Sequence, residues 1–269
     1  MTQSGFQLAG NAAALYEEQK VPAMFAPLAD ATLASLNLSP DEDVIDIACG
    51  TGIVARKIRE LLGTNSRVVG VDLNEPMIEI ARNLQDVYSQ SCEWHISDAT
   101  DLPFKDNEFS IAFCQQGIQF IPDKKGVLRE AYRVLQPNGR IVLTVWDGIA
   151  EFMLPMVDSL SRNVSSEVSN IAKAPFAYDA RRLLPLIENT GFKNIIIDSI
   201  TINRTIASTE QAIRNEIMGM PFGHLVKAKG DEILNNVIHE TLIGLSKFQL
   251  DDNFVIPQQT YLIQATLRD

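Results

Sequence analysis

Apolar residues in the first half of the chain follow two alternating spacings. Short runs rich in valine and isoleucine are typical of buried strands, and longer segments with an apolar residue every three or four positions are typical of helices. These patterns predict strands at about 43–48, 67–72, 93–97, 109–114 and 140–146. They predict helices at about 53–62, from Asn74 onward and at 124–134, and a turn at 137–139. Strands that alternate with helices predict an α/β fold with a parallel sheet and right-handed crossovers.

The second half of the chain continues this alternation in part. Residues 179–190 are predicted to form a helix that ends at Gly191, and residues 193–205 to form a strand. The run 253–268 alternates between apolar and polar residues, as a strand does. Three segments lie outside the alternation of strands and helices: 1–40, about 147–178 and about 207–250. The second and third of these are mainly helical in pattern.

A tight turn with two glycines joins the first predicted strand to its helix, in the sequence VIDIACGTGIVAR. Gly50 and Gly52 let the main chain approach a ligand closely, and the next helix directs its positive dipole end toward the turn. Asp72 closes the second strand, where a carboxylate can accept hydrogen bonds from both hydroxyl groups of a ribose. These features predict a nucleoside-binding βαβ unit. They leave a dehydrogenase open, because residues 50–55 also fit the loose GxGxx[G/A] pattern of NAD sites.

Two further carboxylates separate these alternatives. Asp46 lies inside the first predicted strand, where it would repel a diphosphate but attract the ammonium or sulfonium group of a nucleoside that carries an amino acid. Asp98 follows the third predicted strand, where a carboxylate can accept a hydrogen bond from the exocyclic amine of adenine. Both residues favour an adenosyl amino acid over NAD.

Four segments now resemble, in order, the motifs of class I S-adenosylmethionine-dependent methyltransferases: DIACGTG, VVGVDLNEPMIEIAR, SDATDLPFKDNEFSIAF and EAYRVLQPNGRIVLTVW. The resemblance covers about residues 44–146 and is to the small-molecule branch that includes the ubiquinone/menaquinone methyltransferases. It implies S-adenosyl-L-methionine as the cofactor. It also implies a Rossmann-like, doubly wound sheet of seven mostly parallel strands with a reversed last strand, and a helical cap.

The resemblance also suggests how the chain is divided. Residues 1–40 would form an N-terminal helical cap, and residues 41–206 and 251–269 the methyltransferase core, with 147–178 contributing to the cap. Residues 207–250 would form a helical lid insertion, because additions of this kind shape the acceptor pocket in relatives.

The residues that the resemblance places at the cofactor are Tyr16, Asp46, Ala48, Gly50, Gly52, Asp72, Leu73, Met77, Asp98, Ala99, Cys114 and Gln115. By this resemblance, Asp46 and Gly50 line the methionine and ribose portion of the cofactor, and Asp72 binds the ribose hydroxyl groups. Asp98 and Ala99 hold the edge of the adenine.

The other members of this set have smaller implied roles. Leu73 and Met77 would pack near the adenine, and Cys114 would offer its main-chain carbonyl to the amino group, with Gln115 beside it. Tyr16 resembles an N-terminal aromatic residue that closes over the cofactor, although a packing aromatic on an amphipathic helix fits equally well. Ala48 stands where the family motif commonly has its first glycine.

The acceptor side of the site carries fewer signals. Gln119 stands where many relatives have a histidine that faces the methyl group, and it can position a substrate but cannot act as a base. His224, in the loop GMPFGHL, is the one candidate for a general base among the three histidines. We therefore expect methyl transfer by in-line displacement to an oxygen or nitrogen of a small metabolite. The alternatives are a C-methyltransferase and a protein of this fold that binds the cofactor without transferring methyl.

Composition limits the partners. The net charge of −11 and the absence of a stripe of lysine and arginine argue against nucleic acid as a substrate. Three cysteines without metal-ligand spacing predict reduced thiols and no metal site. The N-terminal sequence lacks the pattern of a signal peptide, and no apolar run reaches membrane-spanning length. We expect a cytoplasmic protein, a monomer or homodimer, that does not associate with membranes.

Overall fold

The computed structural model describes residues 12–63, 65–85, 92–220 and 222–267. The chain divides into two compact units. The first unit comprises Met1–Val145, Asp179–Ile200 and Thr260–Asp269, and the second comprises Trp146–Tyr178 and Thr201–Gln259. The predicted division into cap, core and lid concerns what these segments do, and it stays a prediction.

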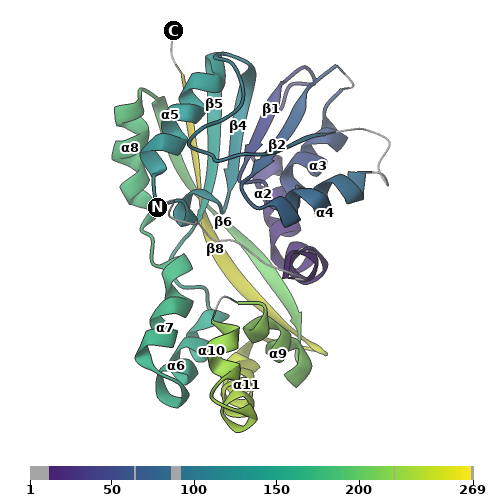
Figure 1. The fold of residues 1–269 in the computed structure, drawn as a ribbon, viewed down its shortest axis with the longest axis vertical. Coiled ribbons are helices and arrows are strands. Elements are labelled where there is room, and N and C mark those ends of the chain that lie inside the picture. Colours follow the sequence, from purple (N-terminus) through teal and green to yellow (C-terminus); the bar gives the residue numbers. More distant parts are fainter. Residues whose placement is uncertain (1–11, 64, 86–91, 221, 268–269) are drawn as a thin grey trace. The chain divides into compact units, whose positions relative to one another are not determined.

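The first unit contains most of the sheet and the helices that cover it (Figure 1). Its elements are α1 (Ala12–Leu15), the π-helix η1 (Tyr16–Phe25), α2 (Ala26–Ala34), β1 (Val44–Ile47), α3 (Ile53–Leu61), β2 (Val68–Asp72), α4 (Glu75–Gln85), β3 (Glu93–Ile96), β4 (Phe109–Gln115), η2 (Ile118–Phe120), α5 (Lys124–Val134), β5 (Leu135–Trp146), η4 (Ala180–Leu183) and α8 (Leu184–Thr190).

The second unit is mainly helical. Its elements are α6 (Met153–Asn163), α7 (Ser166–Lys173), η3 (Ala174–Phe176), α9 (Glu210–Met218), α10 (Gly223–Lys227), α11 (Asp231–Leu245), η5 (Ser246–Phe248) and β7 (Gln249–Leu250). Two long strands, β6 (Lys193–Ala207) and β8 (Asn253–Thr266), have residues in both units. Within the second unit, α11 packs against α6, α9 and α10.

The sheet has the strand order β3-β2-β1-β4-β5-β8-β6, and the short β7 pairs with β8. β1 is parallel to β2 and β4, and the pairs β2–β3 and β4–β5 are also parallel. β8 runs against β5: Thr260 Oγ1 of β8 donates to the carbonyl of Val145, and Leu267 N, just after β8, donates to the carbonyl of Gly139, which lies earlier in β5. The predicted doubly wound, mostly parallel sheet with a reversed last strand is confirmed, and the short β7 adds an eighth strand to the seven that were predicted. The chain changes direction across the sheet at β1 and β4, and ligands of such folds bind beside this switch point.

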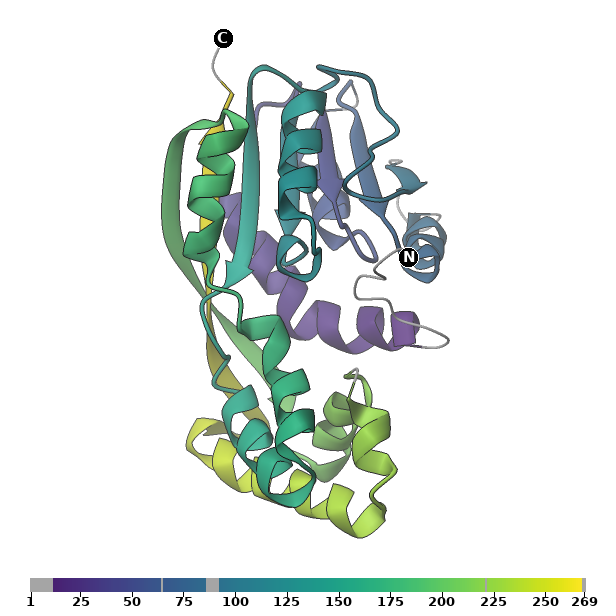
Figure 2. The same cartoon turned by 60° about the vertical axis from the view of Figure 1, so that its left-hand side comes forward.

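Helices cover both faces of this sheet. α2 packs with α3, and α5 packs with α8. Figures 1 and 2 show these two pairs on opposite faces of the sheet in the first unit. All four residues of β1 are buried, as expected for a strand covered on both sides. One apolar cluster extends from Leu33 of α2 through Val44 and Ile58 to Trp94 of β3.

The predicted helix ends agree with the signals in the sequence. The side chain of Asp123 accepts a hydrogen bond from Gly126 N at 2.9 Å and caps α5, whose bounds match the prediction. Gly191 ends α8 with a φ of 116°, a conformation that favours glycine. The helix predicted at 179–190 begins as a 3₁₀ turn, η4, and continues as α8.

The turn predicted at 137–139 was wrong, because these residues lie inside β5. Asn138 does have a φ of 63°, as a turn residue would. The register between β4 and β5 shifts between Phe109 and Ile111, and this irregularity takes up the Pro-Asn-Gly sequence within the strand.

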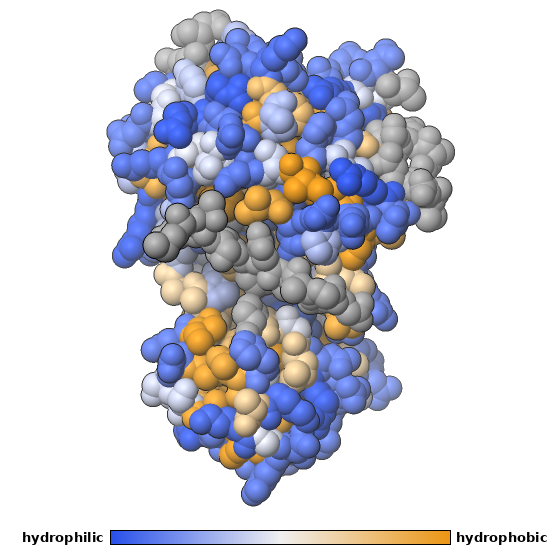
Figure 3. Space-filling model, viewed as in Figure 1, coloured by the Kyte–Doolittle hydropathy of each residue, from blue (hydrophilic) through white to orange (hydrophobic). Residues whose placement is uncertain are grey.

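Hydrophilic side chains cover most of the described surface on the face shown in Figure 3, and apolar side chains form separate patches between them. Among the residues that the structure describes, no helix is both long and apolar enough to cross a membrane.

Candidate functional site

The turn between β1 and α3 lies at the carboxyl edge of the sheet and bends sharply. Ala48, Gly50 and Gly52 have positive φ angles of 57°, 57° and 84°. Glycine adopts this left-handed region freely, whereas another residue there loses about 1–2 kcal/mol. Ala48 is therefore a strained residue in a turn whose motif favours glycine.

The Trp94 side chain of β3 lies under this turn, although no motif in the sequence indicated the contact. A Cβ atom added to Gly52 or to Gly70 would collide with the Trp94 ring. Gly70 is the register partner of Trp94 in the neighbouring strand, and Trp94 is 8% exposed. One glycine in the turn and one in β2 thus make room for the indole ring. A glycine within the valine run of β2 was the available signal.

Asp72 ends β2 and holds the turn through its carboxylate. Its Oδ2 accepts a hydrogen bond from Gly50 N at 2.8 Å, and its Oδ1 accepts one from Asn74 N at 2.8 Å. Burial raises the pKa of this carboxyl, and the hydrogen bonds from the main chain act in the opposite direction. Each carboxylate oxygen can accept a further hydrogen bond, so Asp72 can shape the turn and still bind ribose hydroxyl groups.

Asp46 is buried in β1, with 1% of the residue exposed. Its Oδ2 accepts a hydrogen bond from Ala55 N at 3.3 Å, whereas its buried Oδ1 has no hydrogen-bond partner. Burial raises the pKa of Asp46 to about 8, and the Asp72 carboxylate acts in the same direction. A cation beside Oδ1 would stabilise the ionised form and lower this pKa again.

Tyr16 is the first residue of the π-helix η1 and lies against the turn. A Cβ atom at Gly50 would lie 3.7 Å from the hydroxyl oxygen of Tyr16. The Tyr16 ring stacks on Phe25 with 5.0 Å between centroids, and burial raises the pKa of the hydroxyl. An ion pair of 2.8 Å between Glu17 and Arg56 ties η1 to α3. π-helices are rare and occur often at functional sites, which agrees with this position beside the turn.

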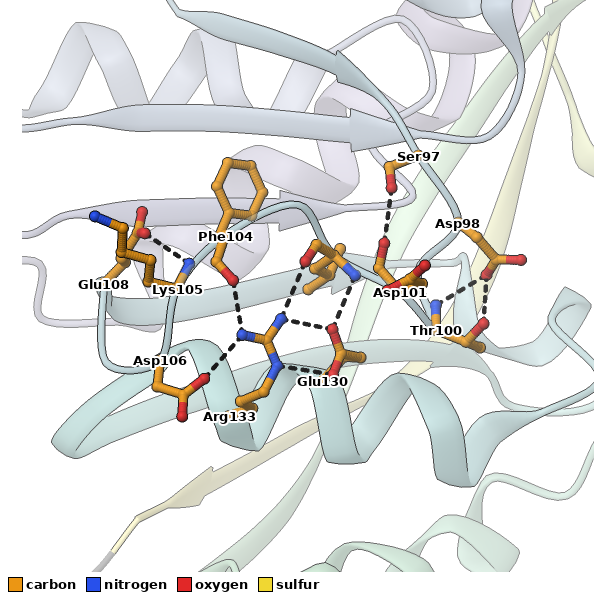
Figure 4. Close-up of polar contacts among 11 residues, drawn as sticks. Ser97, Asp98, Thr100, Asp101, Phe104, Lys105, Asp106, Glu108, Glu130 and Arg133 are labelled. Atoms are coloured by element: carbon orange, nitrogen blue, oxygen red, sulfur yellow. Dashed lines mark hydrogen bonds and ion pairs between the residues drawn. The ribbon is translucent and has the colours of Figure 1, made fainter.

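Asp98 lies in the loop that follows β3 (Figure 4), and Ala99 is the next residue of that loop. Asp98 is exposed, and its Oδ1 accepts hydrogen bonds from the main-chain nitrogen and the hydroxyl of Thr100, both at 2.8 Å. Ala99 is buried. The Asp98 carboxylate is therefore held by a local turn and stays accessible to a ligand.

Arg133 of α5 fixes the far end of this loop, as Figure 4 shows. It donates to the main-chain oxygens of Leu102 at 3.0 Å and Phe104 at 2.7 Å, and to Asp106 at 3.0 Å. It also forms two hydrogen bonds, of 2.9 and 2.7 Å, to Glu130, which in turn accepts from Leu102 N. The path of the loop that carries Asp98 is thus set by α5, a role that no single motif indicated.

β4 ends in Cys114 and Gln115, both predicted at the cofactor. Burial raises the pKa of the Cys114 thiol to about 12, so this residue is not a nucleophile at neutral pH. Gln115 Nε2 donates to the main-chain oxygen of Phe25 at 3.2 Å, and its buried Oε1 has no partner.

Gln116 and Gln119 continue the chain beyond β4. Gln116 has a φ of 54°, and its Nε2 donates to Thr260 Oγ1 at 2.5 Å. Gln119 Nε2 donates to Gln116 Oε1 at 2.9 Å, while the Oε1 of Gln119 is buried without a partner. A Cβ atom at Gly117 would lie 2.7 Å from that of Ala48, so this loop touches the β1–α3 turn. Two strained residues therefore occur in two contacting loops, a pattern that is typical of functional sites.

The remaining predicted residues occupy three environments. Leu73, the residue after β2, is 44% exposed, and Ile96, the register partner of Asp72 at the end of β3, is 42% exposed. Met77 is buried in α4. His224 is exposed on α10 and belongs to the second unit, whereas every other predicted site residue belongs to the first.

The unpartnered buried side-chain atoms at the ends of β1 and β4 are all oxygens, namely Asp46 Oδ1, Thr51 Oγ1, Gln115 Oε1 and Gln119 Oε1. Carboxylate and carbonyl oxygens accept hydrogen bonds and attract cations, so this edge suits ammonium, sulfonium, hydroxyl and amine groups. It does not suit a diphosphate. The residues present therefore fit a nucleoside that carries a positively charged amino acid.

The strand order, the glycine turn and the aspartates on β1 and β2 and after β3 define a class I methyltransferase that uses S-adenosyl-L-methionine. Residues 45–143 match a family model described as a methyltransferase domain. The chain is a methyltransferase that uses S-adenosyl-L-methionine as its cofactor, and it is similar to ubiquinone/menaquinone methyltransferases.

Two relatives carry the names of quinone methyltransferases. The chain is 28% identical over 186 residues to a demethylmenaquinone methyltransferase of Lactobacillus johnsonii, which covers 62% of this chain and 74% of that protein. It is 32% identical over 163 residues to a ubiquinone/menaquinone biosynthesis C-methyltransferase of Hahella chejuensis, and the match covers 55% of this chain and 66% of that protein.

A solved structure has the same fold. The phosphoethanolamine N-methyltransferase 2 of Haemonchus contortus, in complex with phosphomonomethylethanolamine and S-adenosylhomocysteine, superposes with a TM-score of 0.61. It is 19% identical, and the match covers 96% of this chain and 57% of that one.

Proposed function

We propose that this chain transfers the methyl group of S-adenosyl-L-methionine to an oxygen or nitrogen atom of a small metabolite. The observation that carries the proposal is the set of unpartnered, buried acceptor oxygens at the ends of β1 and β4. When bound, the cofactor would supply a methyl group on a cationic sulfur; the bonding electrons would remain on that sulfur, and the proton of the acceptor would pass to the general base, His224 in this proposal. The chain's own residues bind, orient and exclude water, which is where most of the rate of such a displacement originates.

The cofactor residues divide by the part of the ligand that they would hold. Asp46 would face the positively charged amino-acid portion with its free Oδ1, and Gly50 would let the main chain approach the ribose. Asp72 would accept hydrogen bonds from the ribose hydroxyl groups. Asp98 and Ala99 would contact the edge of the adenine.

The rest of the predicted set would support these contacts. Leu73 would cover the adenine together with Met77, and Cys114 would accept from the amino group through its main-chain carbonyl, beside Gln115. Tyr16 would close over the cofactor at the glycine turn.

Ala48 and Gly52 would shape the turn itself. Gln119 would position the acceptor, and His224 would act as a general base.

The net charge of the protein favours a small molecule over a nucleic acid as the methyl acceptor. A net charge of −11 opposes the approach of a nucleic acid, because phosphate-binding proteins need clustered lysine and arginine. C-methylation is the second candidate, because both curated relatives above act in quinone methylation according to their names. Cofactor binding without transfer is the third.

Calorimetry tests the cofactor site, and a labelled-methyl assay tests transfer. S-adenosylhomocysteine should bind and NAD should not. Asp72→Asn should weaken binding by about 1–3 kcal/mol, the usual effect of losing hydrogen bonds to a charged group. Asp252→Asn, an exposed change in the second unit, is the matched control.

The labelled-methyl assay uses metabolite extracts and isotope-labelled S-adenosyl-L-methionine, and the position of the labelled methyl is determined in the product. A methyl group on oxygen or nitrogen supports the proposal, and one on carbon favours the second candidate. Binding of S-adenosylhomocysteine without any labelled product would favour the third candidate, cofactor binding without methyl transfer.

A further inference from the structure

Four groups of the first unit form a chain of hydrogen bonds that begins at a main-chain carbonyl and ends at Gln119. Thr260 Oγ1 donates to the carbonyl of Val145 at 2.9 Å. Gln116 Nε2 donates to Thr260 Oγ1 at 2.5 Å, and Gln119 Nε2 donates to Gln116 Oε1 at 2.9 Å. Val145, Gln116 and Thr260 are all buried, so water does not compete for these bonds.

The number of available protons determines which group donates and which accepts in each of these hydrogen bonds. A carbonyl can only accept, so the single hydroxyl proton of Thr260 is used on Val145. Thr260 can then only accept from Gln116, which must turn its NH₂ group toward the hydroxyl and its carbonyl oxygen toward Gln119. Gln119 must therefore donate through its own NH₂ group. The orientation of the two amides is thus determined by the network and does not depend on telling nitrogen from oxygen.

This series of hydrogen bonds ends at an acceptor oxygen that has no partner. The Oε1 of Gln119 is buried without a hydrogen-bond partner, and the amide cannot rotate to offer its nitrogen without breaking the bond to Gln116. Leaving a buried carbonyl oxygen unpaired is costly, so a ligand that donates to it gains a bond that water does not supply.

We infer that Gln119 Oε1 recognises a hydroxyl or amine hydrogen of the methyl acceptor, and that Thr260 and Gln116 are positioning residues that hold this oxygen in place. This inference rests on the proposed function and specifies its substrate class. The acceptor carries an O–H or N–H group at or beside the atom that is methylated. A tertiary amine, a thioether or an isolated carbon lacks that hydrogen and leaves Gln119 unpaired, which is an effective way to reject a ligand.

The first test asks whether the hydrogen bonds from Thr260 through Gln116 hold Gln119 in the ligand-free protein. With ¹⁵N-labelled glutamine, the side-chain amide signals of Gln116 and Gln119 are followed by NMR in Thr260→Val and Thr260→Ser. Thr260→Val should shift both signals and speed their hydrogen exchange about fivefold, the factor for a hydrogen bond of about 1 kcal/mol. Thr260→Ser keeps the hydroxyl and should restore them.

Thr241→Val is the matched control for this experiment. Thr241 is also buried and also donates from Oγ1 to a main-chain carbonyl, that of Val237, but it lies in the second unit. It should leave both signals unchanged. If Thr260→Val leaves the Gln119 signal unchanged, Thr260 does not position Gln119 and the inference is overturned.

The second test separates the acceptor from the cofactor. Because Gln119 faces the acceptor in this proposal, Thr260→Val should leave the affinity for S-adenosylhomocysteine within about twofold, a change of under 1 kcal/mol. A loss of tenfold or more would assign Oε1 to the cofactor and overturn the proposal.

The third test uses the labelled product from metabolite extracts. A labelled methyl on an oxygen or nitrogen that carried hydrogen, or on a carbon next to such a group, supports the inference. A labelled methyl on a thioether sulfur, a tertiary amine or an isolated carbon would overturn it. Binding of S-adenosylhomocysteine without any labelled product would contradict the proposed function. The NMR result would still decide whether Thr260 and Gln116 hold Gln119 in place.

Discussion

Replacing Asp46 with asparagine is expected to remove most of the pH dependence of cofactor binding. With a pKa of about 8 in the ligand-free protein, about nine in ten Asp46 side chains keep their proton at pH 7. A positively charged ligand beside Oδ1 favours the ionised form, so binding should release close to one proton. Affinity should therefore rise about tenfold between pH 6 and 7 and about fivefold between pH 7 and 8, because the dependence levels off as the pH reaches the pKa.

Calorimetry in two buffers of different ionisation enthalpy measures this proton directly. Asp46→Asn should reduce the release by at least half, and any remainder belongs to Asp72, whose pKa burial also raises. Asp252→Asn should behave as the unaltered protein. If S-adenosylmethionine binds the unaltered protein with neither proton release nor a pH slope, Asp46 does not face the cationic group and the electrostatic reasoning fails.

The same carboxyl predicts how stability changes with pH. The pKa of Asp46 is higher in the folded protein than the ordinary value of 3.8, so the folded state binds this proton more tightly. Its contribution is fully present below about pH 4 and is lost as pH rises through about 8, by about 1.4 kcal/mol per unit at most. Denaturant unfolding of the ligand-free protein should show this decline, and Asp46→Asn should flatten it.

Three further substitutions test other parts of the site. Gly70→Ala should destabilise the protein by about 1–3 kcal/mol in urea unfolding, because the new methyl group meets the Trp94 ring; Gly70→Ala combined with Trp94→Phe should recover part of this loss, and an unaltered midpoint for the single variant would show that the ring moves freely. Arg133→Met should cost about 1–3 kcal/mol and weaken S-adenosylhomocysteine binding, since it leaves two main-chain carbonyls and two carboxylates without this donor. His224→Ala should lower turnover about 10²–10⁴-fold if the imidazole is the base, and an unaltered rate and pH profile would remove it from the mechanism.

Much of the first unit could be predicted from the sequence because its signals are local. The valine and isoleucine runs correspond to β1 and β2, and the helical spacing of apolar residues at 124–134 corresponds to α5. The turn at 137–139 was wrong because the same Pro-Asn-Gly residues can be accommodated within a strand when the neighbouring register shifts. Local composition cannot distinguish these two outcomes.

The parts of the site that could not be predicted depend on contacts between distant segments. Gln116 and Thr260 are 144 positions apart, and the strand that brings them together is the last one in the chain. Trp94 meets two glycines from separate segments, and Asp46 owes its raised pKa to burial that no motif encodes. A motif identifies the residue types that a cofactor needs, whereas the orientation of an amide or the state of a carboxyl follows only from the packed structure.

The two contacting loops carry different kinds of information about function. The β1–α3 turn, with Asp46 and Asp72, presents charge and main-chain groups that suit a constant ligand, the cofactor. The loop after β4 presents Gln119, whose orientation is set by a hydrogen-bond chain and whose free oxygen suits a hydrogen-bond donor. Gln119→Met, which keeps the length of the side chain but removes the acceptor oxygen, should therefore lower transfer to the acceptor about 10-fold or more while S-adenosylhomocysteine affinity stays within about twofold. Equal losses in both measurements would show that the two loops are not separate in function.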